Sequence, residues 1–260
     1  MTPLADTHVH LLAGLDDGPR DPGEADAMCR MLVAEGVRHA TALAHQNESY
    51  PENTAARLRT EAAALTARLQ EKDIALSVYP TGEIILTPDL LEDWQAGKLL
   101  SYGDRGKYLL VEMPHGVTID LRPLASNFRA AGVNFVLAHA ERYLDMLEEP
   151  GVVESFIASG CLIQVTASAL AAPNSAAQER TLKDWTKRGI IHLLGSDGHR
   201  IDRREPRMKA GYEVLAKWGG RSVADRIGGI WGAAVLQGSP IHIPIPAPRT
   251  RSWFSRLLNG

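Results

Sequence analysis

The sequence predicts an α/β fold in which seven parallel strands alternate with helices and close into a distorted seven-stranded (β/α) barrel. Short segments rich in Val, Ile and Leu recur along the chain and are apolar on both faces, as buried parallel strands are. Segments with the apolar spacing of helices separate them, and this alternation indicates a parallel sheet. Seven such units in 260 residues favour a closed barrel over an open sheet.

The strands and helices follow one another in regular order. The predicted strands are Leu4–His8, Val37–Ala44, Ile74–Tyr79, Tyr108–Glu112, Val133–Ala138, Cys161–Thr166 and Ile190–Gly195. Asp21 caps the first helix, Pro22 opens it and Gly36 ends it. The later helices are a segment with Leu58, Ala62, Leu65 and Leu69 on one face, a short segment from Thr87 to Gly97, and Ile119–Ala131, Glu141–Ser159 (broken at Pro150) and Ala176–Arg188.

The chain divides into a barrel domain over residues 1–237 and a tail over residues 238–260. Four prolines alternate with apolar residues between positions 240 and 248, which is typical of an extended segment. A short basic and aromatic stretch, Arg249–Leu258, follows them. Two interpretations stay open: the tail packs back on the domain or is partly disordered, or it contacts a membrane surface or a partner.

Composition narrows the class of protein. The net charge of −3 and the lack of a long basic stretch argue against a nucleic-acid partner. Cys29 and Cys161 lie among apolar residues and are expected in the core, not in a disulfide. No secretory signal precedes the first strand, and no apolar run approaches the ~18 residues of a transmembrane helix. We therefore expect a soluble, cytoplasmic protein.

The ends of the predicted strands carry the chemistry. His8 and His10 are two residues apart, so a strand would point both imidazoles into the same space, as a divalent metal requires. The active site of an α/β barrel lies where the carboxyl ends of its strands meet. Six further side chains of metal-binding type follow later strands: His45, Glu83, Glu112, His139, Asp197 and His199. Each alone could be a helix cap or a core histidine, but their shared location indicates a metal site.

These ligand types also limit the metal. Mixed imidazole and carboxylate ligands suit Zn, Mn or Fe better than Ca or Mg, and eight or nine ligands require two or three ions. Arg142 and Arg204 lie near the same strand ends and suit a phosphate; each could instead be an exposed surface charge. His39, His192 and His242 do not follow strand ends, whereas His115 lies close enough to Glu112 to contact a substrate.

Four stretches of the chain resemble the PHP (polymerase and histidinol phosphatase) superfamily. They are Asp6–His10 with Asp16–Pro19, Gly82–Ile84, His139–Tyr143, and Ser196–Arg200 followed by Arg204. The Asp-Asp-Gly-Pro element is the most discriminating and is similar to that of bacterial manganese-dependent protein-tyrosine phosphatases of capsule and exopolysaccharide gene clusters. Gln46 and Asn47 depart from this family, which commonly has basic residues there.

The resemblance implies a PHP-type barrel with a three-ion site. One ion would be bound by His8, His10, Glu83 and Asp197, a second by Asp17, His45 and His199, and a third by Glu83 as a bridge with Glu112 and His139. Asp16 is an alternative to Asp17. Arg142 and Arg204 would bind the phosphoryl oxygens.

The implied activity is hydrolysis of phosphotyrosine on a bacterial tyrosine autokinase that regulates polysaccharide synthesis, with Mn²⁺ (or Fe or Zn) as cofactor. A metal-bridging hydroxide would attack phosphorus in line, and the phenolate would leave without strong acid assistance. A cysteine-dependent phosphatase needs an arginine six residues after its nucleophile. Glu35 and Ala167 stand there instead, after Cys29 and Cys161.

Three alternatives remain to be weighed. A PHP phosphoesterase would act on a small phosphomonoester such as histidinol phosphate or a sugar phosphate. An amidohydrolase would usually need a lysine at a middle strand end, and the predicted strand ends have none. A catalytically silent binding protein should have lost ligands, yet every ligand position is filled.

Overall fold

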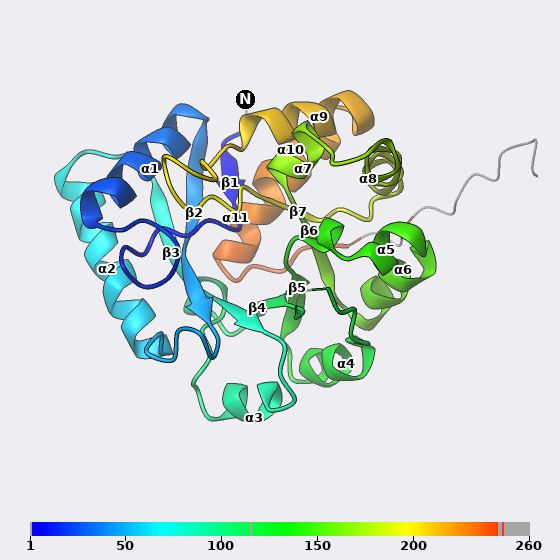
Figure 1. Cartoon of the computed structure of the whole chain (residues 1–260), viewed down its shortest axis with the longest axis horizontal. Coiled ribbons are helices and arrows are strands. Elements are labelled where there is room, and N and C mark those ends of the chain that lie inside the picture. The colour runs from blue at the N-terminus through cyan, green and yellow to red at the C-terminus, as the bar shows by residue number, and fades with distance from the viewer. Residues whose placement is uncertain (1, 115, 244–245, 247–260) are drawn as a thin grey trace, which may run out of the picture.

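The computed structural model describes residues 2–114, 116–243 and 246. Within these ranges, seven parallel strands form one sheet in chain order, which curves into a nearly closed barrel (Figure 1). The strands are β1 (Leu4–Asp6), β2 (Val37–Gln46), β3 (Ser77–Ile85), β4 (Tyr108–Glu112), β5 (Asn134–Leu137), β6 (Leu162–Thr166) and β7 (Leu193–Gly195). The predicted fold class is confirmed.

The barrel closes where β1 approaches β7. The Thr7 amide donates to the Leu194 carbonyl at 3.3 Å, and the Asp197 amide donates to the His8 carbonyl at 2.7 Å. The first strand is shorter than predicted and ends at Asp6. Its continuous hydrogen-bond pairing with β2 stops there, and the chain beyond Asp6 contacts β7. His8 and His10 therefore lie just beyond β1, in the seam between β2 and β7.

Helices surround the barrel (Figure 1). Their bounds are α1 (Pro22–Ala34), α2 (Ala55–Glu71), α3 (Leu90–Gln95), α4 (Arg122–Ala130), α5 (Leu144–Glu148), α6 (Pro150–Ser159), α7 (Ala167–Ala171), α8 (Ala176–Arg188), α9 (Lys209–Gly219), α10 (Arg221–Asp225) and α11 (Trp231–Leu236). Shorter turns are η1 (Tyr102–Asp104), η2 (Ala140–Arg142) and the π-helical η3 (Arg226–Ile230). Asp21 caps α1 as predicted, because its side chain accepts from the Glu24 amide.

Besides the first strand, several predicted elements differ from the structure in their bounds; the largest differences are in the third strand and in the predicted helix Glu141–Ser159. The third strand was placed at Ile74–Tyr79, but it runs over Ser77–Ile85 and continues through Pro80. The strand tolerates this proline because β3 pairs with β4 only from Glu83 onward, so Pro80 borders β2 alone. The predicted helix Glu141–Ser159 is broken not only before Pro150 but also at Tyr143, which leaves three short helices.

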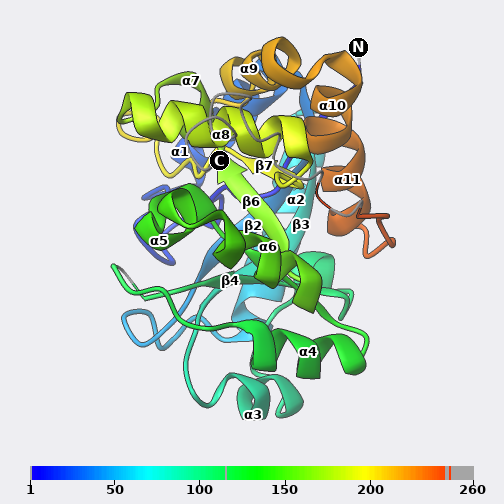
Figure 2. The ribbon, with the colours of Figure 1, turned by 90° about the vertical axis from the view of Figure 1, so that its right-hand side faces the viewer.

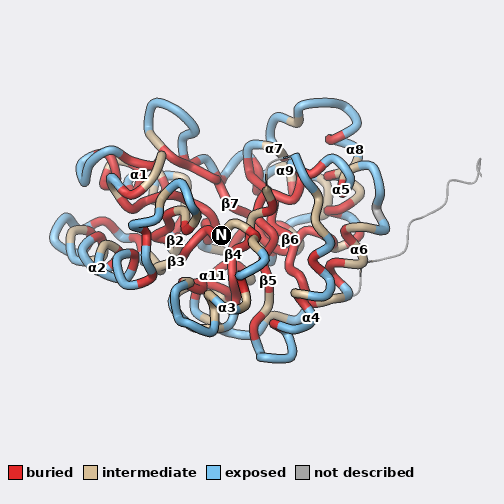
Figure 3. Tube along the Cα trace, turned by 60° about the horizontal axis from the view of Figure 1, so that its bottom comes forward, coloured by how far each residue is buried: buried red, intermediate tan, exposed pale blue. Residues whose placement is uncertain are grey.

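Side chains alternate between the inside and the outside of the barrel. Outward residues pack against the surrounding helices, and inward residues form a second, smaller cluster. Val235 and Leu236 of α11 join that inner cluster, so α11 fills one end of the barrel. In Figure 2, α11 lies on the right, whereas α1 and α5 lie on the left, the side toward which β6 runs. The strands form the buried centre of the molecule in Figure 3.

The described part of the tail packs on the domain. The Tyr108 hydroxyl donates to the Ser239 carbonyl at 3.1 Å, and Ile241 and Ile243 contact the inner cluster. The basic stretch Arg249–Leu258 lies outside the described residues. Among the helices of the described ranges, none combines the length and apolarity needed to cross a membrane.

Candidate metal centre

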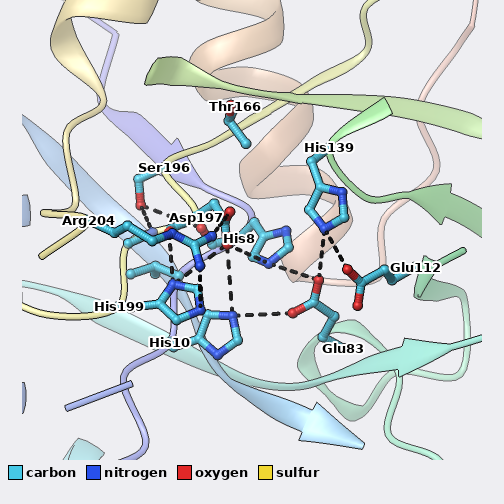
Figure 4. A network of polar contacts seen from close by, with 12 residues as sticks. His8, His10, Glu83, Glu112, His139, Thr166, Ser196, Asp197, His199 and Arg204 are labelled. Atoms are coloured by element: carbon cyan, nitrogen blue, oxygen red, sulfur yellow. Dashed lines mark hydrogen bonds and ion pairs between the residues drawn. The ribbon is translucent and has the colours of Figure 1, made fainter. Parts of the chain in front are cut away.

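The carboxyl ends of the strands bring the predicted ligands into one cluster (Figure 4). His45 and Glu83 lie within β2 and β3 and are opposite each other in the sheet register. Glu112 ends β4, and His139 follows β5. The nine predicted ligands, His8, His10, Asp17, His45, Glu83, Glu112, His139, Asp197 and His199, all contact at least one other member of the set.

Glu83 lies at the centre of the cluster. Its Oε1 is 3.2 Å from His8 Nε2 and 3.3 Å from His139 Nε2. Its Oε2 is 3.2 Å from both His10 Nε2 and His45 Nδ1. Burial alone would raise the pKa of Glu83, but the surrounding imidazoles hold it well below its usual range. A carboxylate that remains ionised among four imidazoles is suited to bridge metal ions.

A second part of the cluster surrounds Asp17. Its Oδ1 is 3.3 Å from His199 Nε2 and 3.6 Å from His45 Nε2. The contact with His199, and then that with His45, holds the pKa of Asp17 far below its usual range. Ligand atoms of His10, Asp17, His45 and His199 all lie within 4.8 Å of one another, a spacing that one ion could span.

Asp16 has a different role. Its Oδ2 accepts from His10 Nδ1 at 2.8 Å and from the His45 amide at 2.9 Å, while Oδ1 accepts from the Gly18 amide at 2.9 Å. These bonds occupy the Asp16 carboxylate and fix the orientation of the His10 ring. The geometry therefore favours Asp17 over Asp16 as the metal ligand.

Asp197 links the ligand cluster to the two predicted arginines. Its Oδ1 is 3.4 Å from His8 Nε2, and its Oδ2 accepts from both Arg142 and Arg204. Arg204 also lies 3.2 Å from His199 Nε2. Burial opposes ionisation of Asp197, but His8 and the two arginines lower its pKa well below the usual range.

The backbone is strained at this point of the fold. Positive φ angles occur at His139 (33°), Asp197 (53°) and Arg204 (57°), where side chains other than glycine are disfavoured. Gly195, two residues before Asp197, has no room for a side chain because a Cβ there would lie 2.5 Å from His8 Cβ. The close approach of β7 to His8 thus depends on glycine.

The donor set fits divalent metal ions. His8 Nε2, His10 Nε2, Asp17 Oδ1 and Glu83 Oε2 are buried and have no hydrogen-bond partner within the described part of the chain. Buried polar atoms are costly when unsatisfied, and metal coordination would satisfy them. The opposite ring nitrogens are already held: Gln164 Oε1 is 2.9 Å from His8 Nδ1, and Asp16 holds His10 Nδ1. This leaves each Nε2 directed toward Glu83 and Asp197, as in histidine ligands oriented by a second hydrogen bond.

Two orienting residues were missed in the sequence. Gln164 on β6 holds His8, and its Nε2 donates to Thr7 Oγ1 at 2.8 Å. Asp6 Oδ1 accepts from the amides of His8 and Ser196, at 3.1 and 2.9 Å, and burial raises the pKa of Asp6 to about 6. A polar residue inside an otherwise apolar strand, as in Leu162–Thr166, was the available sign of Gln164.

The remaining histidines lie away from the cluster or outside the described residues. His39 bonds Tyr79, and His192 accepts from the Ile163 amide. His242 lines a separate cavity near α6. His115, predicted to contact a substrate, lies outside the described residues.

Beside the ligands is a pocket of about 220 Å³ lined by Glu112, His139, Arg142, Arg204, Tyr143, Met113 and Gly116. The two guanidinium groups border it, and each is about 40% exposed (41% for Arg142 and 40% for Arg204). Guanidinium forks of this kind bind phosphate or carboxylate oxygens. The pocket is therefore suited to an anion next to bound metal.

Both cysteines are buried away from this pocket. Burial raises the pKa of the Cys29 and Cys161 thiols to about 12. A thiol with such a pKa is not a nucleophile at neutral pH. The chemistry of the pocket thus depends on the imidazoles, carboxylates and arginines.

Comparison with known proteins agrees with this arrangement. The family described as capsular polysaccharide synthesis, CpsB/CapC, matches residues 4–237. The tyrosine-protein phosphatase YwqE of Bacillus subtilis is 30% identical over 215 residues, 82% of this chain and 84% of that protein. The tyrosine-protein phosphatase CpsB of Streptococcus pneumoniae is 26% identical over 222 residues, 82% of this chain and 90% of that protein.

A solved structure is also similar. It is one of the crystal structures of YwqE from B. subtilis and CpsB from S. pneumoniae, which are described as metal-dependent tyrosine phosphatases. The TM-score is 0.86 at 27% identity, and the match covers 95% of this chain and 100% of that one. The likeness therefore extends over most of the chain.

Proposed function

This chain belongs to the CpsB/CapC family of capsular polysaccharide synthesis and is a tyrosine-protein phosphatase, and we propose that it uses Mn²⁺ to dephosphorylate a bacterial tyrosine autokinase. The observation that carries the chemistry is the Glu83 carboxylate, buried at 3.2–3.3 Å from four imidazoles and next to a pocket bordered by two arginines. Fe or Zn would also accept these ligands.

We propose that the nine ligands hold two or three ions. His8, His10, Glu83 and Asp197 would bind one, Asp17, His45 and His199 a second, and Glu112 and His139, with Glu83 as a bridge, a third. The distances also allow other groupings, because His10 lies within reach of Asp17 and His45 lies within reach of Glu112. When bound, the ions would supply Lewis-acid charge and activate water for hydrolysis.

The side chains of the pocket position the substrate. Arg142 and Arg204 would pair with two phosphoryl oxygens and balance the charge that grows on them during transfer. Both guanidinium groups bond Asp197, which holds them at the pocket. Phosphate binding thus requires no large movement of either arginine.

Departure of the leaving group needs little help from the protein. A tyrosine phenolate has a pKa near 10, so it leaves more readily than a serine alkoxide. Tyr143, the phenol that lines the pocket, donates to the Met113 carbonyl and accepts from the Met113 amide. It is engaged in holding the loop after β4, and we assign it no proton-transfer role.

The family and the state of the two thiols support the proposed partner and location. A capsule-synthesis phosphatase would meet a tyrosine kinase at the cytoplasmic face of the export machinery. Two buried cysteines that form no disulfide are compatible with the reducing cytoplasm. We therefore propose a cytoplasmic enzyme.

The test is a substrate panel with purified protein and Mn²⁺. We expect release of phosphate from p-nitrophenyl phosphate and from a phosphotyrosine peptide, with little from the matched phosphoserine peptide. Histidinol phosphate and sugar phosphates serve as comparison substrates. Preference for these small phosphates by orders of magnitude would replace the proposal with a small-molecule phosphoesterase, and no phosphate release from any substrate would refute it.

A further inference from the structure

Exposed apolar side chains gather around the mouth of the barrel. Within the described residues, four large apolar side chains are exposed: Val117, Leu144, Ile201 and Ile230. Single exposed apolar residues are ordinary, but three of these four lie on segments that follow the carboxyl ends of β4, β5 and β7. The same strand ends form the metal centre.

Two of the three are adjacent in sequence to residues that line the 220 Å³ pocket beside the metal ligands, called the phosphate pocket below. Gly116 and Tyr143 both line the pocket, and Val117 and Leu144 are the residues that follow them. Leu144 begins α5 and is 62% exposed. Figure 2 shows α5 and the segment between β4 and α4 on the same side of the molecule.

The size of the pocket limits what it can hold. Its volume of about 220 Å³ is below the roughly 300–1,000 Å³ of sites that enclose a whole small ligand. It suits one phosphorylated side chain. The residues before and after a phosphotyrosine must then lie across the rim, where they meet Val117 and Leu144.

A neutral groove continues from the pocket on the Leu144 side. It has a volume of about 690 Å³ and shares Arg142 with the pocket. Its lining combines the apolar residues Leu144, Leu147, Ala169 and Ala172 with the uncharged polar residues Thr166, Ser168, Asn174, Ser175 and Gln178. Its only charged lining residues among those described are Glu141 and Arg142. Glu141 is buried and accepts from the Thr166 hydroxyl at 2.6 Å, and Arg142 is bonded to Asp197.

The cavity on the other side of the mouth has a different character. It begins at Gln46, next to His45, and has a volume of about 590 Å³. Its lining includes apolar residues such as Ile84 and Leu99, but it also includes five charged side chains: Glu48, Arg59, Asp89, Asp93 and Lys98. An apolar residue of a substrate would therefore be accommodated on the Leu144 side, where no exposed carboxylate has to lose water.

We propose that Val117, Leu144 and the groove behind Leu144, together called the apolar rim, bind an apolar residue adjacent to phosphotyrosine in the protein substrate. This inference rests on the proposed phosphatase function and adds the sequence context of the substrate. Burial of one apolar side chain at a partly open surface should increase kcat/KM by about five- to tenfold.

The experiment compares two phosphotyrosine peptides that differ only beside the phosphotyrosine. One has Leu on both sides and the other has Asn, which has a similar size but is polar. Kinetics are measured with the Mn²⁺-loaded protein and with the double variant Leu144→Asn, Val117→Thr. The matched control is Ile230→Thr, since Ile230 is 55% exposed on η3 and lies far along the chain from the rim.

The ratio of kcat/KM between the two peptides is the readout. We expect a five- to tenfold preference for the Leu peptide in the parent and in Ile230→Thr, expressed mainly in KM, and a ratio near one in the double variant. Equal kcat/KM for the two peptides in the parent protein, or a preference for the Leu peptide that persists in the double variant, would overturn the inference. Failure to hydrolyse either peptide would instead count against the phosphatase function itself.

Discussion

The two ends of the barrel both bury histidines, but these histidines face different surroundings. At the carboxyl end, His8 and His10 direct their Nε2 atoms toward carboxylates, and among the described residues these atoms have no hydrogen-bond partner. At the amino end, His192 precedes β7, and its Nδ1 accepts from the Ile163 amide at 2.9 Å. Complete burial is common to all three side chains. His192 Nε2 likewise lacks a hydrogen-bond partner among the described residues, so a ligand is distinguished from a structural histidine by the carboxylate that its Nε2 faces.

The two ends also differ in what they contribute to stability. Charges gathered at the carboxyl end lose hydration, and their mutual attraction repays that cost only in part. The amino end is filled by α11, whose Val235 and Leu236 pack among the inward residues of the strands. Gly232 permits this approach, because a Cβ there would lie 2.9 Å from Ala5 Cβ. The amino end thus stabilises a barrel whose other end is arranged for binding.

The largest expected effect is from Glu83→Gln at the carboxyl end. Loss of the central carboxylate charge should lower kcat/KM for p-nitrophenyl phosphate by at least about 10³-fold, because several ligands depend on this residue together. The bound Mn²⁺, measured by elemental analysis, should fall below that of the parent. The fold should be retained by circular dichroism, since an amide of equal size replaces a group that burial disfavours.

Glu179→Gln is the matched control, because Glu179 is exposed on α8 and has no contact with the ligand cluster among the described residues. It should keep the activity and metal content of the parent. A Glu83→Gln protein with full activity would show that Glu83 is not a ligand.

The next largest effect is expected from metal removal, which should lower the free energy of unfolding. An ion that binds only the folded state at a concentration 100 times its Kd contributes about 2.7 kcal/mol. For a chain of this size, that corresponds to a fall in Tm of roughly 5–10 °C on chelation. Scanning calorimetry with and without EDTA, followed by addition of Mn²⁺, measures the change.

Glu83→Gln provides the comparison for that experiment. If its Tm falls by as much as that of the parent on chelation, EDTA acts elsewhere than on this cluster. An unchanged Tm in the parent would mean that bound metal does not stabilise the carboxyl end.

The sequence predicted those features that depend on local pattern. The bounds of α8 were predicted as Ala176–Arg188 and are the same in the structure, because Ser175 caps its start and Gly189 its end. Eight of the nine proposed ligands were predicted from the rule that parallel strands place their carboxyl ends together, which requires only the order of the strands. Asp17 was predicted from the resemblance of the Asp16–Pro19 element.

Features that depend on distant partners could not be predicted in this way. Gln164 acts on His8 across the barrel, and nothing near Gln164 in the sequence specifies that neighbour. The choice between Asp16 and Asp17 likewise depends on His45 and His199, which approach from other strands. The inward packing of α11 was not anticipated either, because a short apolar helix after the last strand resembles an outer helix in sequence.

The smallest effect expected is a pH dependence that belongs to the amino end alone. Burial lowers the pKa of His192 to about 3, from 6.5 in the unfolded chain, and the Ile163 amide already donates to its Nδ1. The unfolded state therefore binds one more proton between these values, so the contribution of His192 is fully present above pH 6.5 and is lost as the pH falls toward 3. At pH 5 the loss is about 2 kcal/mol.

The variant His192→Asn keeps an acceptor for the Ile163 amide but cannot be protonated. The free energies of unfolding of this variant and of the parent, measured by urea unfolding in EDTA, should therefore converge between pH 7.5 and pH 5. Parallel stability curves for the two proteins would show that His192 has the same pKa in the folded and unfolded chain, and would remove the proposed distinction between the two ends.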